Sequence, residues 1–195
     1  MIFYNNTFRI KIPNSDIYRI HQHLDFYIQE KAGLKIPYSF KIIPGSANDS
    51  AILLRTALPL ALPGEEIKEI HLKTGDTVSF ATTLAVIRHE IVAGKKKQMT
   101  PPPERLEEYI HARLARAGFT VQSLVAGQPE NIIVRKYSSE RMTPVLVPVS
   151  AIRATCVISS VAEAEKALVY GIGRKRIFGF GFLKPFRVND NDESY

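Results

Sequence analysis

The sequence predicts an α+β fold, in which helices pack on one face of a β-sheet. Segments with the two-residue alternation of half-buried strands are interspersed with segments of helical spacing. Hydrophobic residues make up 45% of the 195 residues and charged residues 23%, which is typical of a chain that folds around a core. This length suffices for one large domain or for two domains of roughly 90–100 residues.

The first half begins with a strand and a helix. Apolar side chains alternate with cationic ones at positions 8–12, which predicts a strand over residues 3–12. Turn and N-cap residues follow at 13–16, and apolar residues then recur at helical spacing to about residue 32. Further strands are expected at 38–43, 51–58, 67–72 and 77–87.

A change of composition near residue 91 indicates a domain boundary. A basic stretch at 94–97 and three prolines at 101–103 predict an exposed loop that ends in a stiff linker. The second half again alternates helices and strands, and a Ser160–Glu163 capping box opens its last helix. We therefore expect an N-terminal domain at 1–90, a basic loop and linker at 91–103, a C-terminal domain at 104–188 and an acidic tail at 189–195.

The charge favours a polyanionic partner. The net charge is +7, and the last seven residues hold three acids and no base, so the rest of the chain carries +10. Such a balance is typical of nucleic-acid binding, although a basic enzyme with another substrate can share it. No apolar run reaches the ~18–20 residues of a membrane span, and the start lacks the layout of a signal peptide. With a single Cys156 and hence no internal disulfide, the sequence predicts a cytoplasmic protein that does not bind membranes.

A glycine-rich segment near the end of the chain combines the two features that phosphate binding requires. Its glycines can expose backbone N–H groups, and three consecutive cations lie between them. A dinucleotide-binding fingerprint would need a glycine where Arg176 stands, and no Walker-type motif occurs. A glycine-rich hairpin with a solvated basic tip remains the alternative. The candidate binding residues are Gly171, Gly173, Arg174, Lys175, Arg176, Gly179 and Gly181.

The first helix carries a candidate pair for proton transfer. Tyr18 and His21 are three residues apart and share a helix face, with Asp25 on the same side. Histidine transfers protons near neutral pH, and RNA cleavage by its own 2′-hydroxyl needs such a group. Surface helices often carry such a pair without function. His21 and His23 point about 200° apart on a helix, so they cannot share a metal ion, and we expect no metal or other cofactor.

Taken together, these segments resemble a known family. The glycine-rich segment after a helix resembles the loop of the RAMP superfamily of CRISPR-associated proteins. Residues 16–24, directly after the first strand, are similar to the start of the catalytic helix in CasE-type CRISPR RNA endoribonucleases. The resemblance extends from residue 1 to about residue 185. The chain departs from it at Arg88–Ile91, where the family often has Arg-x-Asn-Pro, and at Arg176, where the family usually has lysine.

The resemblance implies two tandem ferredoxin-like (RAMP/RRM-like) domains and metal-independent cleavage of CRISPR repeat stem-loop RNA. Tyr18 and His21 would be catalytic, and the products would carry 5′-hydroxyl and 2′,3′-cyclic phosphate ends. The enzyme would keep the mature crRNA and join other subunits of a prokaryotic effector complex. The RNA-binding residues would be those of the glycine-rich segment together with Arg88, Lys95, Lys96 and Lys97.

Two alternatives remain open from the sequence. A non-catalytic RNA-binding RAMP subunit would share the fold and the glycine-rich loop, but it would have no chemical need for His21. An unrelated basic α+β protein would bind a protein surface and would show no salt-sensitive affinity for RNA. Whether His21 acts as the general acid or the general base also stays open.

Overall fold

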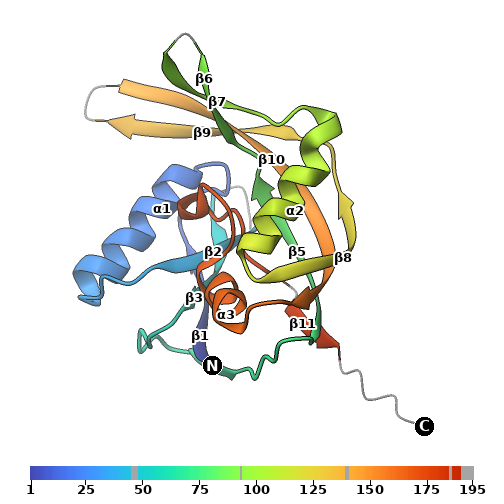
Figure 1. The fold of residues 1–195 in the computed structure, drawn as a ribbon. Helices are drawn as coiled ribbons and strands as arrows, with labels where there is room; N and C mark the ends of the chain where they lie inside the picture. Colours follow the sequence, from blue (N-terminus) through green and yellow to red (C-terminus); the bar gives the residue numbers. More distant parts are fainter. Residues whose placement is uncertain (45–47, 93, 139–140, 185, 190–195) are drawn as a thin grey trace.

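The computed structural model describes residues 1–44, 48–92, 94–138, 141–184 and 186–189. Its main body consists of two antiparallel sheets, each with helices on one face (Figure 1). The expected acidic tail lies beyond the described residues except for Asn189.

The first sheet contains β1 (Ile2–Ile10), β2 (Tyr38–Pro44), β3 (Ser50–Thr56) and β4 (Glu66–Glu69) in the order β2-β3-β1-β4. All its pairings are antiparallel. The helix α1 (Ile17–Asp25), continued by the π-helical segment η1 (Phe26–Lys31), connects β1 to β2. This order of strands around a βαββ chain is that of a ferredoxin-like unit, and here residues 57–65 contain no second helix.

The second sheet repeats the same arrangement. It contains β5 (Thr77–Ala85), β8 (Phe119–Ala126), β10 (Arg141–Ile158) and β11 (Phe186–Asn189) in the order β11-β5-β10-β8. The helix α2 (Leu106–Arg116) connects β5 to β8, and α3 (Val161–Tyr170) connects β10 to β11. The short η2 (Pro103–Arg105) precedes α2. The two tandem ferredoxin-like units expected from the resemblance are therefore present.

Two hairpins extend this second unit. β9 (Glu130–Ser138) pairs with the first half of β10 and forms a long arm, and β6 (Arg88–Val92) pairs with β7 (Lys95–Met99). Both hairpins lie at the same end of the molecule, above α1 in Figure 1. The basic stretch expected to be a loop is thus largely a hairpin, because its lysines lie in β7.

The division between the sheets differs from the expected boundary at residues 91–103. β5 pairs with β10 and β11, so the division falls between β4 and β5, near residues 70–76. The alternation over residues 77–87 predicts a strand, but it cannot predict which strands this one pairs with. A second difference concerns the last helix: Ser160 occupies the N-cap position of α3, but its side chain makes no capping hydrogen bond.

Each unit has its own core, and buried polar side chains join the two. The first core includes Ile20, Leu24 and Phe40, which are fully buried between α1 and its sheet. Across the junction, the Ser39 hydroxyl donates to the Val169 carbonyl over 2.6 Å. Thus α3 of the second unit packs directly against the first sheet, which fixes the position of the glycine-rich segment that follows α3.

Candidate active site and nucleic-acid interface

The helix α1 carries the candidate catalytic pair on its flank. Asp16 caps its start by accepting a hydrogen bond from the Arg19 N–H over 3.3 Å, as the sequence predicts. The buried stripe of α1 faces the first sheet, and His21 and Tyr18 flank this stripe. The two rings lie 6.4 Å apart, centroid to centroid.

The His21 ring occupies a half-closed polar site. Its side chain is 14% exposed. Nδ1 lies 3.3 Å from the Tyr38 hydroxyl, and Nε2 lies 3.4 Å from Oδ2 of Asp25. Burial lowers the pKa of His21 below 6.5, and the Asp25 carboxylate opposes this shift only in part. The imidazole is therefore largely neutral at pH 7.

Aromatic contacts bring α1 to the glycine-rich segment. His21 meets the Phe178 ring edge to face, with 5.9 Å between centroids. Tyr18 lies 6.4 Å from both Phe178 and Tyr137, so it packs between this segment and β9 of the long arm. The two candidate sites that the sequence places about 150 residues apart thus meet at Phe178.

The glycines of this segment allow the chain to pack closely on itself. All four have positive φ, and the N–H of Gly181 donates to the Thr83 carbonyl of β5. A Cβ at Gly181 would overlap the carbonyl oxygen of Ile172, and one at Gly173 would lie 2.6 Å from a Leu84 methyl. We expected these glycines to let a binding partner approach the backbone closely. In the structure they let other segments of the same chain approach it. They form the turn that presents η3 (Arg176–Phe178) to α1.

The three consecutive cations of the segment point to different neighbours. The ammonium of Lys175 lies 6.0 Å from the centroid of Phe178, the same ring that His21 contacts. Arg174 approaches His89 of β6 at 3.4 Å, and its buried Nε has no hydrogen-bond partner among the described residues. Arg176 donates to the carbonyls of Tyr170 and Gly171 over 3.3 and 3.4 Å. Lys175 is therefore the cation of this segment that shares the Phe178 ring with His21.

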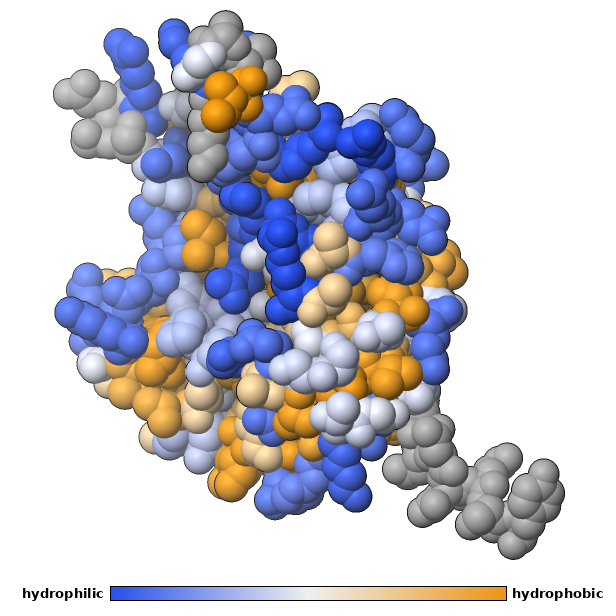
Figure 2. Space-filling view, in the orientation of Figure 1, coloured by the Kyte–Doolittle hydropathy of each residue, from blue (hydrophilic) through white to orange (hydrophobic). Residues whose placement is uncertain are grey.

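The β6–β7 hairpin supplies the other predicted cations. Lys95 and Lys97 are exposed, whereas the side chain of Lys96 lies outside the described residues. Arg88 forms an ion pair with Glu90 at 2.7 Å. The hairpin and the glycine-rich segment share a cleft of about 370 Å³, which His89 and Gln98 line on one side and Arg174 on the other. Figure 2 shows hydrophilic side chains running from this hairpin down over the middle of the same face.

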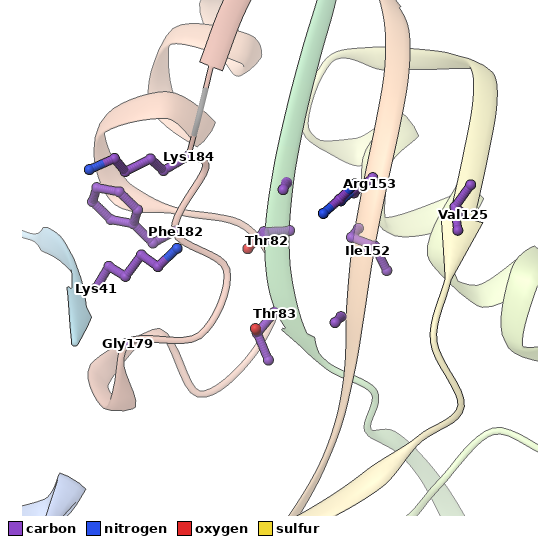
Figure 3. Close-up of a pocket in the computed structure, with 11 residues that line it drawn as sticks. Lys41, Thr82, Thr83, Val125, Ile152, Arg153, Gly179, Phe182 and Lys184 are labelled. Atoms are coloured by element: carbon purple, nitrogen blue, oxygen red, sulfur yellow. The ribbon is translucent and has the colours of Figure 1, made fainter. Parts of the chain in front are cut away.

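The fold brings to this region several residues that no sequence pattern indicated. Tyr38 completes the surroundings of His21, but it lies on a strand 17 residues further along the chain. A groove of about 340 Å³ between the units is lined by Lys41 of β2, Arg153 of β10 and Lys184 (Figure 3). These cations are far apart in the sequence, so no local pattern indicated them.

Among the described residues, no three or more His, Cys, Asp or Glu side chains gather where they could hold a metal ion. Cys156 is buried, as the sequence predicts, and burial raises its pKa to about 11. None of the helices described is long and apolar enough to cross a membrane.

The chain is similar to several solved structures over almost its whole length. Thermus thermophilus Cse3, bound to an RNA that represents a pre-cleavage complex, is 13% identical, with a TM-score of 0.70 over 96% of this chain and 98% of that one. The CRISPR-associated protein Cas6e from Escherichia coli K-12 is 14% identical, with a TM-score of 0.63 over 94% and 97%. A chain of a CRISPR RNA-guided surveillance complex is 18% identical, with a TM-score of 0.71 over 95% and 100%.

These likenesses establish the fold that the sequence resemblance implied. No curated protein matches the chain by sequence. A family model for CRISPR-associated proteins does match residues 56–184, which is more than half of the chain and includes the hairpin cations and the whole glycine-rich segment. The chain therefore belongs to this family of CRISPR-associated proteins.

Proposed function

We propose that this protein is a metal-independent endoribonuclease that cleaves the stem-loop of CRISPR repeat RNA. The observation that carries the proposal is the position of His21, a partly exposed and largely neutral imidazole beside the basic glycine-rich segment. Family membership supports it, as does the likeness to solved structures, which include the CRISPR endoribonuclease Cse3 bound to a 19-nucleotide RNA.

The chemistry is an attack of the RNA on itself. A base removes the proton of the 2′-hydroxyl, the 2′-oxygen forms a bond to phosphorus, and the bond from phosphorus to the 5′-oxygen breaks. The departing 5′-oxygen takes up a proton, which gives 2′,3′-cyclic phosphate and 5′-hydroxyl ends. His21 acts as the general base because its lowered pKa keeps it neutral near pH 7. Tyr18 positions the 2′-hydroxyl, and Lys175 offsets charge on the pentacoordinate phosphate.

The hairpin cations bind the RNA stem. A-form RNA offers its phosphates and its shape rather than its base edges, so exposed lysines suit it. Lys95 and Lys97 project from β7 next to the cleft that contains Arg174. Arg174 and Arg176 extend this basic surface, and the glycines contribute by setting its shape. The protein then retains the mature crRNA within a cytoplasmic effector complex with other subunits.

The proposal is tested by cleavage of a hairpin repeat RNA in the presence of excess chelator. Wild-type protein should cut at one position, and a 2′-deoxy substitution at that nucleotide should abolish cutting. His21→Ala should lose most of the rate while its affinity for RNA stays unchanged. His23→Ala is the matched control, because His23 lies exposed on the same helix, two residues away.

Two outcomes would contradict the proposal. Equal behaviour of wild type and His21→Ala, with salt-sensitive RNA binding in both, would favour a non-catalytic RNA-binding subunit. Cutting of the 2′-deoxy RNA would exclude the proposed mechanism.

A further inference from the structure

A short hydrogen-bond chain that ends on a carboxylate holds the His21 ring. Tyr38, at the start of β2, donates its hydroxyl hydrogen to Oδ1 of Asp25 over 2.6 Å. The same hydroxyl oxygen lies 3.3 Å from Nδ1 of His21. Asp25 lies one helical turn after His21, and its second oxygen, Oδ2, lies 3.4 Å from Nε2. Side chains from α1 and β2 thus contact both nitrogens of the imidazole.

The directions of these hydrogen bonds follow from counting hydrogens. A tyrosine hydroxyl has one hydrogen, and its short bond to a carboxylate uses it. Burial, together with the hydrogen bond to Asp25 and the charge of its carboxylate, raises the pKa of Tyr38 well above 10, so this hydrogen stays in place. Toward His21 the hydroxyl can therefore only accept, so the hydrogen bond between them requires a hydrogen on Nδ1. In a neutral imidazole the lone pair is then on Nε2.

We propose that Tyr38 and Asp25 are positioning residues, which hold neutral His21 in the Nδ1–H tautomer so that Nε2 exchanges the proton with RNA. This inference rests on the proposed ribonuclease function. When Nε2 takes the proton of the 2′-hydroxyl, the imidazolium carries a hydrogen on each nitrogen. Nδ1–H then donates to Tyr38, and the Asp25 carboxylate, whose Oδ2 lies 3.4 Å from Nε2, stabilises the positive charge of the ring. The logic is that of an acid which orients a catalytic histidine and stabilises its charged form.

The other neighbours of His21 do not compete for its nitrogens. Phe178 of η3 and Tyr18 of α1 meet the imidazole with their rings. Lys175 extends over the ring of Phe178, with its ammonium 6.0 Å from the ring centroid. Asp25 is the one carboxylate in ion-pair contact with His21 among the described residues. The tautomer and the pKa of His21 should therefore respond to changes at positions 38 and 25.

The tautomer can be measured in the free protein without RNA. In protein labelled with ¹⁵N at histidine, the ring nitrogen shifts and couplings above the pKa distinguish Nδ1–H from Nε2–H, and His21→Ala identifies the resonances. We expect the Nδ1–H form in wild type and a mixture of both forms in Tyr38→Phe. Tyr27→Phe is the control, since Tyr27 is partly buried against the same core and lies on η1. An Nε2–H form in wild type, or an unchanged form in Tyr38→Phe, would overturn the inference.

Cleavage kinetics test whether the tautomer matters for the reaction. Under single-turnover conditions with saturating protein, Tyr38→Phe should slow cleavage about 10- to 100-fold, the loss expected for one hydrogen bond to a charged group. Its affinity for RNA should not change. Asp25→Asn should move the acidic limb of the pH–rate profile to lower pH, because the carboxylate no longer favours the imidazolium. A variant that is merely less stable would not move this limb. The inference would be contradicted if Asp25→Asn left the limb in place and Tyr38→Phe left the rate unchanged.

The two measurements separate this inference from the proposed function. If wild-type protein cuts RNA but its His21 is in the Nε2–H form, only the positioning role fails. If the Nδ1–H form is present but no RNA is cut, the hydrogen-bond assignment stands and the ribonuclease function fails.

Discussion

Protonation of His21 is less favourable in the folded protein than in the unfolded chain. Burial lowers its pKa below the value of about 6.5 that it has in an unfolded chain, and Asp25 compensates only in part. Between these two pKa values the unfolded chain binds more protons than the folded one. The free energy of unfolding therefore decreases as the pH falls through this window, and the contribution is constant above it.

A comparison of wild type with His21→Gln isolates this effect, because glutamine does not titrate. The difference in free energy of unfolding, wild type minus variant, should be flat above about pH 7 and should decline below about pH 6.5. Urea unfolding at a series of pH values measures it, and the other titrating groups cancel in the difference. A difference that increased on acidification would mean that the Asp25 carboxylate raises the pKa of His21 by more than burial lowers it.

Single residues differ in how far the sequence could predict them. Tyr18 and His21 were predictable as a pair because helical spacing alone places them on one face. Tyr38 was not, since its contact with His21 depends on how α1 lies on β2. Helical spacing also places Asp25 on the same side of the helix as His21. The hydrogen bond that Asp25 accepts from Tyr38 could not be predicted, because it too depends on how α1 lies on β2. Local periodicity thus indicates the candidate catalytic pair, but not the side chains of other elements that contact it.

At the scale of elements, most strands and helices follow from local patterns. The alternation in β1 and the apolar stripe of α1 come directly from their own residues. The pairing of β5 with β10 rather than with the first sheet is a contact between segments about 70 residues apart, which no local pattern contains. The glycine-rich segment was recognised for its composition, but its turn is set by close contacts with β5 and β2 that only the fold reveals.

Gly181 and Gly64 offer a matched test of that turn. Both have positive φ, 80° and 78°, but a Cβ at Gly181 meets the backbone of Ile172, whereas one at Gly64 meets nothing within 4 Å. Gly64→Ala should cost only the strain of a left-handed residue, about 1–2 kcal/mol. Gly181→Ala should cost about 1–3 kcal/mol more because of overpacking. Denaturant unfolding of both variants measures the difference, and equal losses would mean that the chain around Gly181 can move away from the Ile172 backbone.

Across the whole molecule, a buried arginine joins the two units. Arg55 of β3 is 5% exposed, its guanidinium lies between the rings of Phe3 and Phe182, and it donates to the Leu168 carbonyl of α3 over 2.7 Å. Burial lowers its pKa to about 10, so it keeps its charge at neutral pH. The side chain therefore joins the first sheet to the helix that precedes the glycine-rich segment.

Replacing this arginine should weaken both units together. Arg55→Met removes a cation–π contact and leaves buried carbonyl groups without a donor, which should cost about 2–4 kcal/mol of unfolding free energy. Arg9→Met is the control, because the Arg9 side chain is 76% exposed and its ion pair with Asp49 lies at the surface. That change should cost at most about 1 kcal/mol. Unfolding followed by fluorescence and by circular dichroism measures both, and a small loss for Arg55→Met would show that apolar packing alone holds the units together.

The charge of the whole molecule should govern its affinity for RNA. With a net charge of +7 and exposed lysines on β7, binding to a repeat hairpin should weaken steeply with salt, because each neutralised phosphate releases counterions. The double variant Lys95→Gln, Lys97→Gln should reduce the slope of log K against log salt by about 1–2.

Lys68→Gln should leave the slope unchanged, since Lys68 lies on β4 of the other sheet and already pairs with Glu66 at 2.8 Å. Fluorescence anisotropy from low to high salt measures the slopes. Equal slopes for the double variant and wild type would mean that the RNA stem does not contact the β6–β7 hairpin, even if cleavage at His21 is retained.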